Sequence, residues 1–108
     1  MKWNHLSNSH ELEELIAASH NTPQLIFKHS TTCSISAVAK KRIDKHEQQP
    51  DLPFHYLDLL KHRSISNNIA TLFGVEHESP QVLLIKNGKC VYNESHLAIY
   101  MEDILKKA

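Results

Sequence analysis

The fold is decided by one stretch of the sequence, Leu25-Ile26-Phe27-Lys28-His29-Ser30-Thr31-Thr32-Cys33. It opens with an apolar run that is typical of a buried strand. Three hydroxyl residues follow, and such residues favour a helix start. Beyond Cys33, apolar residues recur at helical spacing and indicate a helix from about Cys33 to His46. The stretch therefore predicts a strand, a turn and a helix that begins at a cysteine.

Helices and strands alternate on both sides of this stretch. We expect further helices from Asn8 or Ser9 to before Pro23, from Arg63 to Phe73 and from Ile99 to Lys107. We expect strands at Leu25–Phe27, Phe54–Asp58, Val82–Ile85 and Cys90–Tyr92, and a weak one at Trp3–Leu6. Asn87-Gly88 predicts a hairpin turn between the last two strong strands.

This order predicts an α/β fold. The alternation of strands and helices favours parallel pairing through crossovers, whereas the two-residue turn requires an antiparallel final pair. We expect one domain over residues 1–108, with a mixed four-stranded sheet and helices on both faces. Trp3–Leu6 can add a short fifth strand at the N-terminus. This is the thioredoxin-like arrangement.

The composition argues against nucleic acid or a membrane as partner and against secretion of the protein. Lys plus Arg and Asp plus Glu number 12 each, so no net charge attracts nucleic acid or an anionic membrane. The apolar runs are too short to span a bilayer, and the first residues do not form a signal peptide. No two of the nine histidines have the i, i+4 spacing of a helical metal-ligand pair. We expect a cytoplasmic protein with no metal site.

Cys33 is the candidate catalytic residue. Free amides and the helix dipole at a helix start favour a thiolate. We expect the hydroxyls of Thr32, Ser34 and Ser36 to donate hydrogen bonds to the sulfur. Lys28 and His29 are candidate sources of positive charge, unless the strand points them elsewhere. The alternative is a small, inert cysteine packed at the helix start.

Position 36 predicts how a disulfide on Cys33 is resolved. A dithiol oxidoreductase has its second cysteine there, but this chain has Ser36. Cys90 lies beside the hairpin turn, whereas Cys33 lies at the other end of the sheet. A strand ~15–20 Å long separates the two ends. A disulfide between Cys33 and Cys90 would need Cα atoms within about 7 Å. We therefore expect a structural role for Cys90 and a monothiol mechanism in which an outside thiol resolves the mixed disulfide.

Ser79-Pro80 precedes the third strong strand. The local sequence favours a trans bond, because only about 5–6% of X-Pro bonds in folded proteins are cis. The position in the fold changes this expectation, because thioredoxin-like folds place a cis-proline here, opposite the helix-start cysteine. The residue before it then offers free backbone groups to an extended substrate. We therefore add Ser79 and Pro80 to the candidate site for the substrate or thiol.

The sequence resembles the YtxJ-like bacilliredoxins, the bacilliredoxin C type, over nearly its whole length. The shared stretches are Phe27–Cys33, Ile35-Ser36, Tyr56–Leu59, His62–Asn67, His77–Leu84 and Lys86–Lys89. The resemblance implies a monothiol protein that removes bacillithiol from bacillithiolated client proteins. Bacillithiol is then the co-substrate, without a tightly bound cofactor, and the expected reductant is bacillithiol or a flavin disulfide reductase. Ser34 replaces the proline of the family pattern Thr-Cys-Pro-Ile-Ser, which adds an N–H and a hydroxyl beside the sulfur.

Two other functions compete with this one. A thioredoxin-like scaffold can act as an interaction module without catalysis. Monothiol glutaredoxins, which carry iron–sulfur clusters, also pair a helix-start cysteine with a serine three residues later. This chain lacks the Gly-Phe that those proteins have between the two residues.

Overall fold

The computed structural model describes residues 1–47 and 49–108. Five strands form one sheet in the order β1-β3-β2-β4-β5. The strands are β1 (Trp3–His5), β2 (Gln24–His29), β3 (Phe54–Asp58), β4 (Gln81–Lys86) and β5 (Lys89–Ser95). The helices are α1 (Ser9–Ala18), α2 (Ser34–Asp44), α3 (Arg63–Phe73), the 3-10 turn η1 (His96–Ala98) and α4 (Met101–Lys107).

The sheet is mixed, as the sequence predicts. β3 pairs in parallel with β1 and β2, while β4 pairs antiparallel with β2 and β5. The N-terminal strand is present and adds the fifth strand at the β3 edge. The α/β, thioredoxin-like fold class is therefore confirmed.

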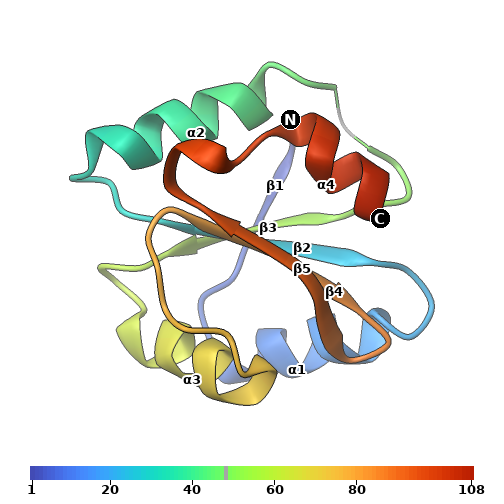
Figure 1. Ribbon diagram of the computed structural model, residues 1–108. Helices are drawn as coiled ribbons and strands as arrows, with labels where there is room; N and C mark the ends of the chain where they lie inside the picture. Colours follow the sequence, from blue (N-terminus) through green and yellow to red (C-terminus); the bar gives the residue numbers. More distant parts are fainter. Residues whose placement is uncertain (48) are drawn as a thin grey trace.

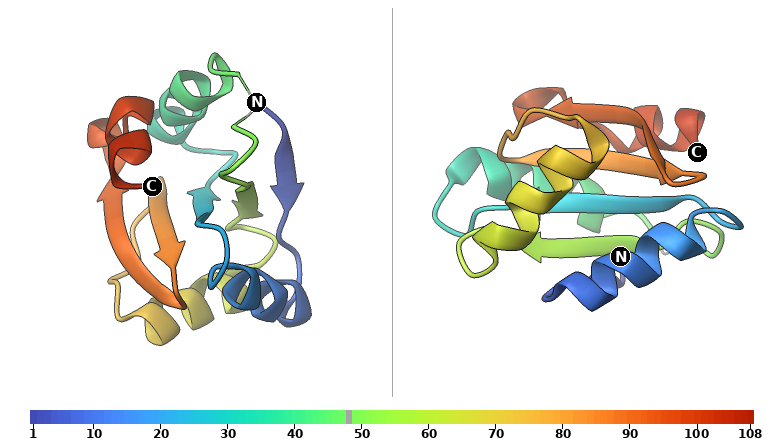
Figure 2. Two further views of the ribbon diagram at one scale, coloured as in Figure 1. Left: turned by 90° about the vertical axis from the view of Figure 1, so that its right-hand side faces the viewer. Right: turned by 90° about the horizontal axis from the view of Figure 1, so that it is seen from below.

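Helices cover both faces of the sheet (Figure 1). Phe27 of β2 faces the core under α2 and α4, whereas its neighbour Ile26 faces the core under α1 and α3. Figure 2 shows the two helical layers on either side of the strands. Because β2 is covered on both faces, all its residues are buried. This explains why it has a continuous apolar run rather than an alternating pattern.

Several boundaries differ from the prediction. Cys33 is the N-cap of α2 rather than its first helical residue. The closing helix starts at Met101, after the separate turn η1, and not at Ile99. β2 continues through Lys28 and His29, although both side chains are polar. Polarity hides this extension in the sequence, because a polar residue in a buried strand needs partners that only the tertiary structure supplies.

The predicted turn and helix end are confirmed. Asn87 and Gly88 have φ angles of 53° and 73°, the left-handed values that a two-residue hairpin needs. Ser19 holds this turn, because its carbonyl oxygen accepts from Asn87 N and its Oγ accepts from Gly88 N. Gly74 ends α3 with φ 63°. Within residues 1–47 and 49–108, none of the helices is long and apolar enough to cross a membrane.

The topology gathers the candidate site at one edge of the sheet. β2 ends at His29, and Cys33 follows it after a short turn. β4 runs antiparallel to β2, so its start, just after Pro80, lies at the same edge. The end of β5 reaches this edge as well, because Ser95 pairs with Gln81. In Figure 1 these segments meet on the left, while the hairpin turn lies at the opposite end.

The folded protein should lose stability in mild acid partly through His55. Its Nε2 lies 2.7 Å from Oε1 of the buried Gln24, and burial lowers the pKa of His55 from 6.5 to about 4. Between these values the unfolded chain binds a proton that the folded chain does not, so stability falls as the pH falls from 6.5 towards 4. Denaturant unfolding at several pH values should show a shallower fall for His55→Gln. His10→Gln, at an exposed site, should follow the parent, and parallel curves for all three proteins would contradict the assignment.

Candidate functional site

Cys33 occupies the start of α2 in a partly exposed position. The turn from Ser30 to Cys33 precedes the helix, and in it Cys33 N donates to Ser30 O at 3.2 Å. Its carbonyl oxygen accepts from Ala37 N at 3.1 Å and so begins the helix. Its side chain does not cap the helix, and the first turn of α2 carries no acidic residue. Cys33 therefore lies at the N-terminal end of α2, in a turn that carries no acidic side chain.

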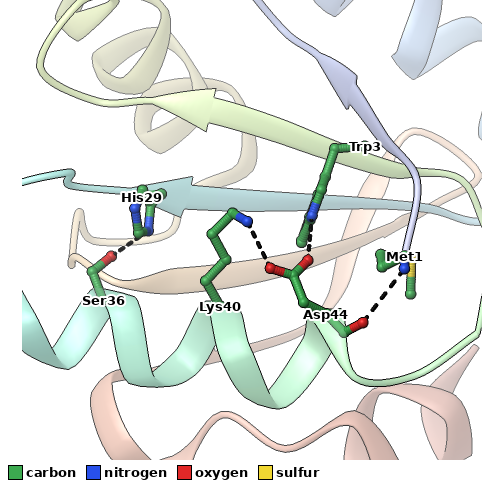
Figure 3. A network of polar contacts seen from close by, with 6 residues as sticks. All are labelled: Met1, Trp3, His29, Ser36, Lys40 and Asp44. Carbon is green, nitrogen blue, oxygen red and sulfur yellow. Dashed lines mark hydrogen bonds and ion pairs between the residues drawn. The ribbon is translucent and has the colours of Figure 1, made fainter.

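Ser36 is completely buried one turn further along α2. Its Oγ accepts from Ser30 N at 3.1 Å. The same oxygen lies 2.8 Å from His29 Nδ1 (Figure 3). One hydroxyl thus joins the end of β2, the turn and the helix that carries Cys33. The expected hydrogen bond from Ser36 to the sulfur is wrong, because the hydroxyl faces β2.

The other two hydroxyls of the predicted site lie in the turn and at the helix start. Thr32 Oγ1 lies 3.2 Å from Ser30 Oγ, so it has a partner inside the turn. Ser34 is exposed at the first helical position of α2. Among the described residues, neither hydroxyl forms a hydrogen bond with the Cys33 sulfur. Their role towards a thiol ligand stays a prediction.

His29 has a structural role, through ring packing and its contact with Ser36, and does not provide a positive charge. Its ring is buried between Phe27 and Tyr56, with ring centroids 5.5 and 5.4 Å away. Burial and the nearby Lys40 cation lower the pKa of His29 below its ordinary value. The ring is therefore neutral near pH 7, and the expectation that it adds charge at the sulfur is wrong.

Lys28 points to the other face of the sheet. It is fully buried, and its Nζ donates to Ser66 O of α3 at 3.2 Å and lies 3.3 Å from His77 Nδ1. In the part of the chain that is described, no carboxylate pairs with it. Burial lowers the pKa of Lys28 from 10.5 to about 8. Lys28 thus holds α3 and the segment before Pro80, so of the two alternatives for this residue the strand points it away from Cys33.

The Ser79–Pro80 peptide bond is cis, as expected. Because Lys28 pairs with Gln81, the antiparallel register places Pro80 beside His29, at the edge that holds Cys33. Within residues 1–47 and 49–108, the buried hydroxyl of Ser79 has no hydrogen-bond partner.

Contacts around Pro80 add residues that the sequence reasoning missed. Pro80 O accepts from His96 N at 2.9 Å, and His96 Nε2 lies 3.3 Å from Glu78 Oε2. His77 contributes through its contact with Lys28. The polar run before Pro80 was visible in the sequence. The return of β5 to the same edge, however, depends on the register of the hairpin.

The far end of α2 is anchored to β1 (Figure 3). Asp44 accepts from Trp3 Nε1 at 2.7 Å and from Lys40 Nζ at 2.6 Å. The backbone oxygen of Asp44 also accepts from the N-terminal ammonium of Met1 at 3.4 Å. Together with Ser36, these contacts fix α2 at both of its ends, which holds Cys33 in place.

Cys90 lies away from this edge, in the strand that follows the hairpin turn. It pairs with Ile85, and its Sγ donates to Tyr92 O at 3.3 Å. Burial raises the pKa of the Cys90 thiol, which favours its inert, protonated form. Both cysteines are free. This environment suits the predicted structural role.

Replacing Ser36 by alanine should destabilise the fold. The change leaves Ser30 N and His29 Nδ1 buried without their partner, which costs about 1–3 kcal/mol of unfolding free energy. Urea unfolding measures the loss. Ser64→Ala, at an exposed position of α3, is the control and should change little. Equal stability of Ser36→Ala and Ser64→Ala would contradict the structural role of the hydroxyl.

Replacing Lys28 by methionine should stabilise the protein at neutral pH. The folded and unfolded chains both carry the charge at pH 7, so the cost of burying it is fully present there. Methionine removes that cost, by about 1–3 kcal/mol. The parent, but not Lys28→Met, should gain stability from pH 8 to 10.5, because the folded parent loses the Lys28 proton before the unfolded chain does.

Urea unfolding at pH 7 and across this alkaline range measures both effects. Lys89→Met, at an exposed position of β5, should not be stabilised at pH 7 and should keep the alkaline gain of the parent, because it retains Lys28. A less stable Lys28→Met protein at pH 7 would show that the two hydrogen-bond contacts outweigh the burial cost.

Comparisons with known proteins agree with this site. Residues 4–104 match the family described as monothiol bacilliredoxin BrxC. A solved structure described as a candidate oxidoreductase with a thioredoxin fold is 32% identical, with a TM-score of 0.86 over 97% of this chain and 92% of that one.

More distant structures share the fold alone. Thioredoxin from Fasciola hepatica is 18% identical, with a TM-score of 0.80 over 97% of this chain and 99% of that one. Thioredoxin from Schistosoma mansoni is 23% identical, with a TM-score of 0.71 over 98% and 94%. With the family match and the helix-start cysteine, the conclusion is that this chain belongs to the monothiol bacilliredoxin family of thiol–disulfide oxidoreductases.

Proposed function

We propose that this protein removes bacillithiol from S-bacillithiolated client proteins through a mixed disulfide on Cys33. The observation that carries the proposal is the pairing of an accessible helix-start cysteine with a buried hydroxyl at position 36. A dithiol enzyme would expel its substrate with a second sulfur there. This chain has no sulfur at that place, so its chemistry requires a thiol from solution.

The reaction proceeds by two thiol–disulfide exchanges. The Cys33 thiolate attacks the bacillithiol sulfur of the modified client, the client thiolate leaves and takes a proton from water, and Cys33 carries the bacillithiol. A second bacillithiol thiolate then attacks the bacillithiol sulfur of this adduct. The products are the Cys33 thiolate and bacillithiol disulfide, which a flavin disulfide reductase returns to two thiols elsewhere. Each step exchanges one S–S bond for another, so the protein needs no tightly bound cofactor.

The edge of the sheet supplies the binding surface for this chemistry. Thr32 and Ser34 flank the sulfur and are the candidate contacts for the bacillithiol moiety. Ser79 and Pro80 lie across from the end of β2 and are the candidate contacts for the client chain. We place the reaction in the cytoplasm, where the thiol pool keeps cysteines such as Cys33 and Cys90 reduced.

Intact-mass spectrometry tests the proposal. The reduced protein is mixed with a bacillithiolated client, and both masses are followed with time. The client should lose bacillithiol while the protein gains it, and added bacillithiol should then release the free protein. Cys90→Ser should behave as the parent, because Cys90 lies away from the site. If Cys33→Ala strips the client as fast as the parent does, the mechanism is wrong.

A further inference from the structure

His96 has a backbone conformation that its local sequence does not explain. Among the described residues, Asn87 and His96 are the only residues other than glycine with a positive φ, at 53° and 57°. The hairpin turn requires this value at Asn87. His96 follows directly on β5 and opens η1, with no glycine to relieve the crowding of its Cβ. Such a conformation persists only where surrounding contacts hold it.

The contacts of His96 converge on the segment around Ser79. Its backbone N donates to Pro80 O at 2.9 Å, and its Nε2 lies 3.3 Å from Glu78 Oε2. One residue thus contacts the positions on both sides of Ser79. Because the imidazole and the carboxylate are each about half exposed, this pair lies at the rim of the site.

The turn that begins at His96 is also tied to the helix of Cys33. Arg42 Nη1 of α2 donates to Leu97 O at 2.6 Å and to Ile99 O at 3.2 Å. The segment from His96 to Ile99 therefore connects two parts of the site: Leu97 and Ile99 contact the helix that carries the sulfur, and His96 contacts the segment around Ser79. Ser79 itself is left with a buried hydroxyl that, within residues 1–47 and 49–108, has no partner.

We propose that His96 is a positioning residue that holds Glu78 and Pro80 so that Ser79 can pair with an extended client polypeptide beside Cys33. The inference rests on the proposed function for the identity of the client, but it concerns the polypeptide and not the bacillithiol. The left-handed conformation of His96 is retained because it directs the backbone N–H to Pro80 and the imidazole to Glu78 at once.

A pair of activated disulfides tests this inference without bacillithiol. One is a nine-residue peptide whose central cysteine is linked to thionitrobenzoate, and the other is N-acetylcysteine amide with the same group. The Cys33 thiolate attacks the cysteine sulfur of either compound and forms a mixed disulfide, and the coloured thionitrobenzoate thiolate leaves. The measured quantity is the ratio of the two rate constants, with all proteins in a Cys90→Ser background.

The parent should prefer the peptide, and His96→Gly should reduce that ratio by about 3- to 10-fold. Its melting temperature should stay the same or rise, because glycine accepts the positive φ. Asn87→Gly removes a side chain from the other positive-φ position, in the hairpin turn at the opposite end of the sheet. It should keep the parent's ratio of peptide to N-acetylcysteine amide rate constants. Glu78→Gln, which keeps an acceptor oxygen for the imidazole, should stay close to the parent, whereas Glu78→Ala should match His96→Gly.

Three outcomes would overturn the inference. They are an unchanged ratio in His96→Gly, an equal loss in Asn87→Gly, and a parent that does not prefer the peptide. None of these depends on bacillithiol transfer. A parent that prefers the peptide but fails the intact-mass assay would overturn the proposed function and leave the role of His96 standing.

Discussion

The site depends on one buried hydroxyl, that of Ser36. It joins the end of β2 to the first turn of α2 through Ser30 N and the ring of His29. A sulfur at this position would bind both groups more weakly, because a thiol is a poor donor and acceptor. Ser36, which stands where a dithiol enzyme has its resolving cysteine, therefore also fixes the position of Cys33. The absence of a cysteine at position 36 and the fixed position of Cys33 thus both depend on Ser36.

The polar end of β2 is shared between the two faces of the sheet. His29 points to α2 and Lys28 to α3, and both are buried. Neither adds a cation beside the sulfur, and the first turn of α2, which follows Cys33, carries no acidic residue. Lys28 instead connects Ser66 and His77, which fixes the segment that leads to Pro80. His29, on one face of β2, thus positions the helix that carries Cys33, and Lys28, on the other face, positions the segment that leads to Pro80.

The sequence predicts the fold because its apolar runs, helix starts and hairpin turn all favour the same arrangement. It identifies Cys33 and the Ser79–Pro80 segment because both follow from position along the chain. It does not reveal the partners of buried polar groups. The direction of Lys28 and the conformation of His96 depend on register and on packing between distant elements, and no local pattern encodes these.

The anchor at the far end of α2 has an optical consequence. Trp3 is the single tryptophan of the chain, its indole N–H donates to Asp44, and the Lys40 ammonium lies 5.7 Å from its ring centroid. Both partners belong to the helix that begins beside Cys33. Indole emission responds to nearby charge and hydrogen bonding, so the intrinsic fluorescence of the protein reports any displacement of this helix. The molecule carries its own label for following the helix in real time, without a dye or an added chromophore.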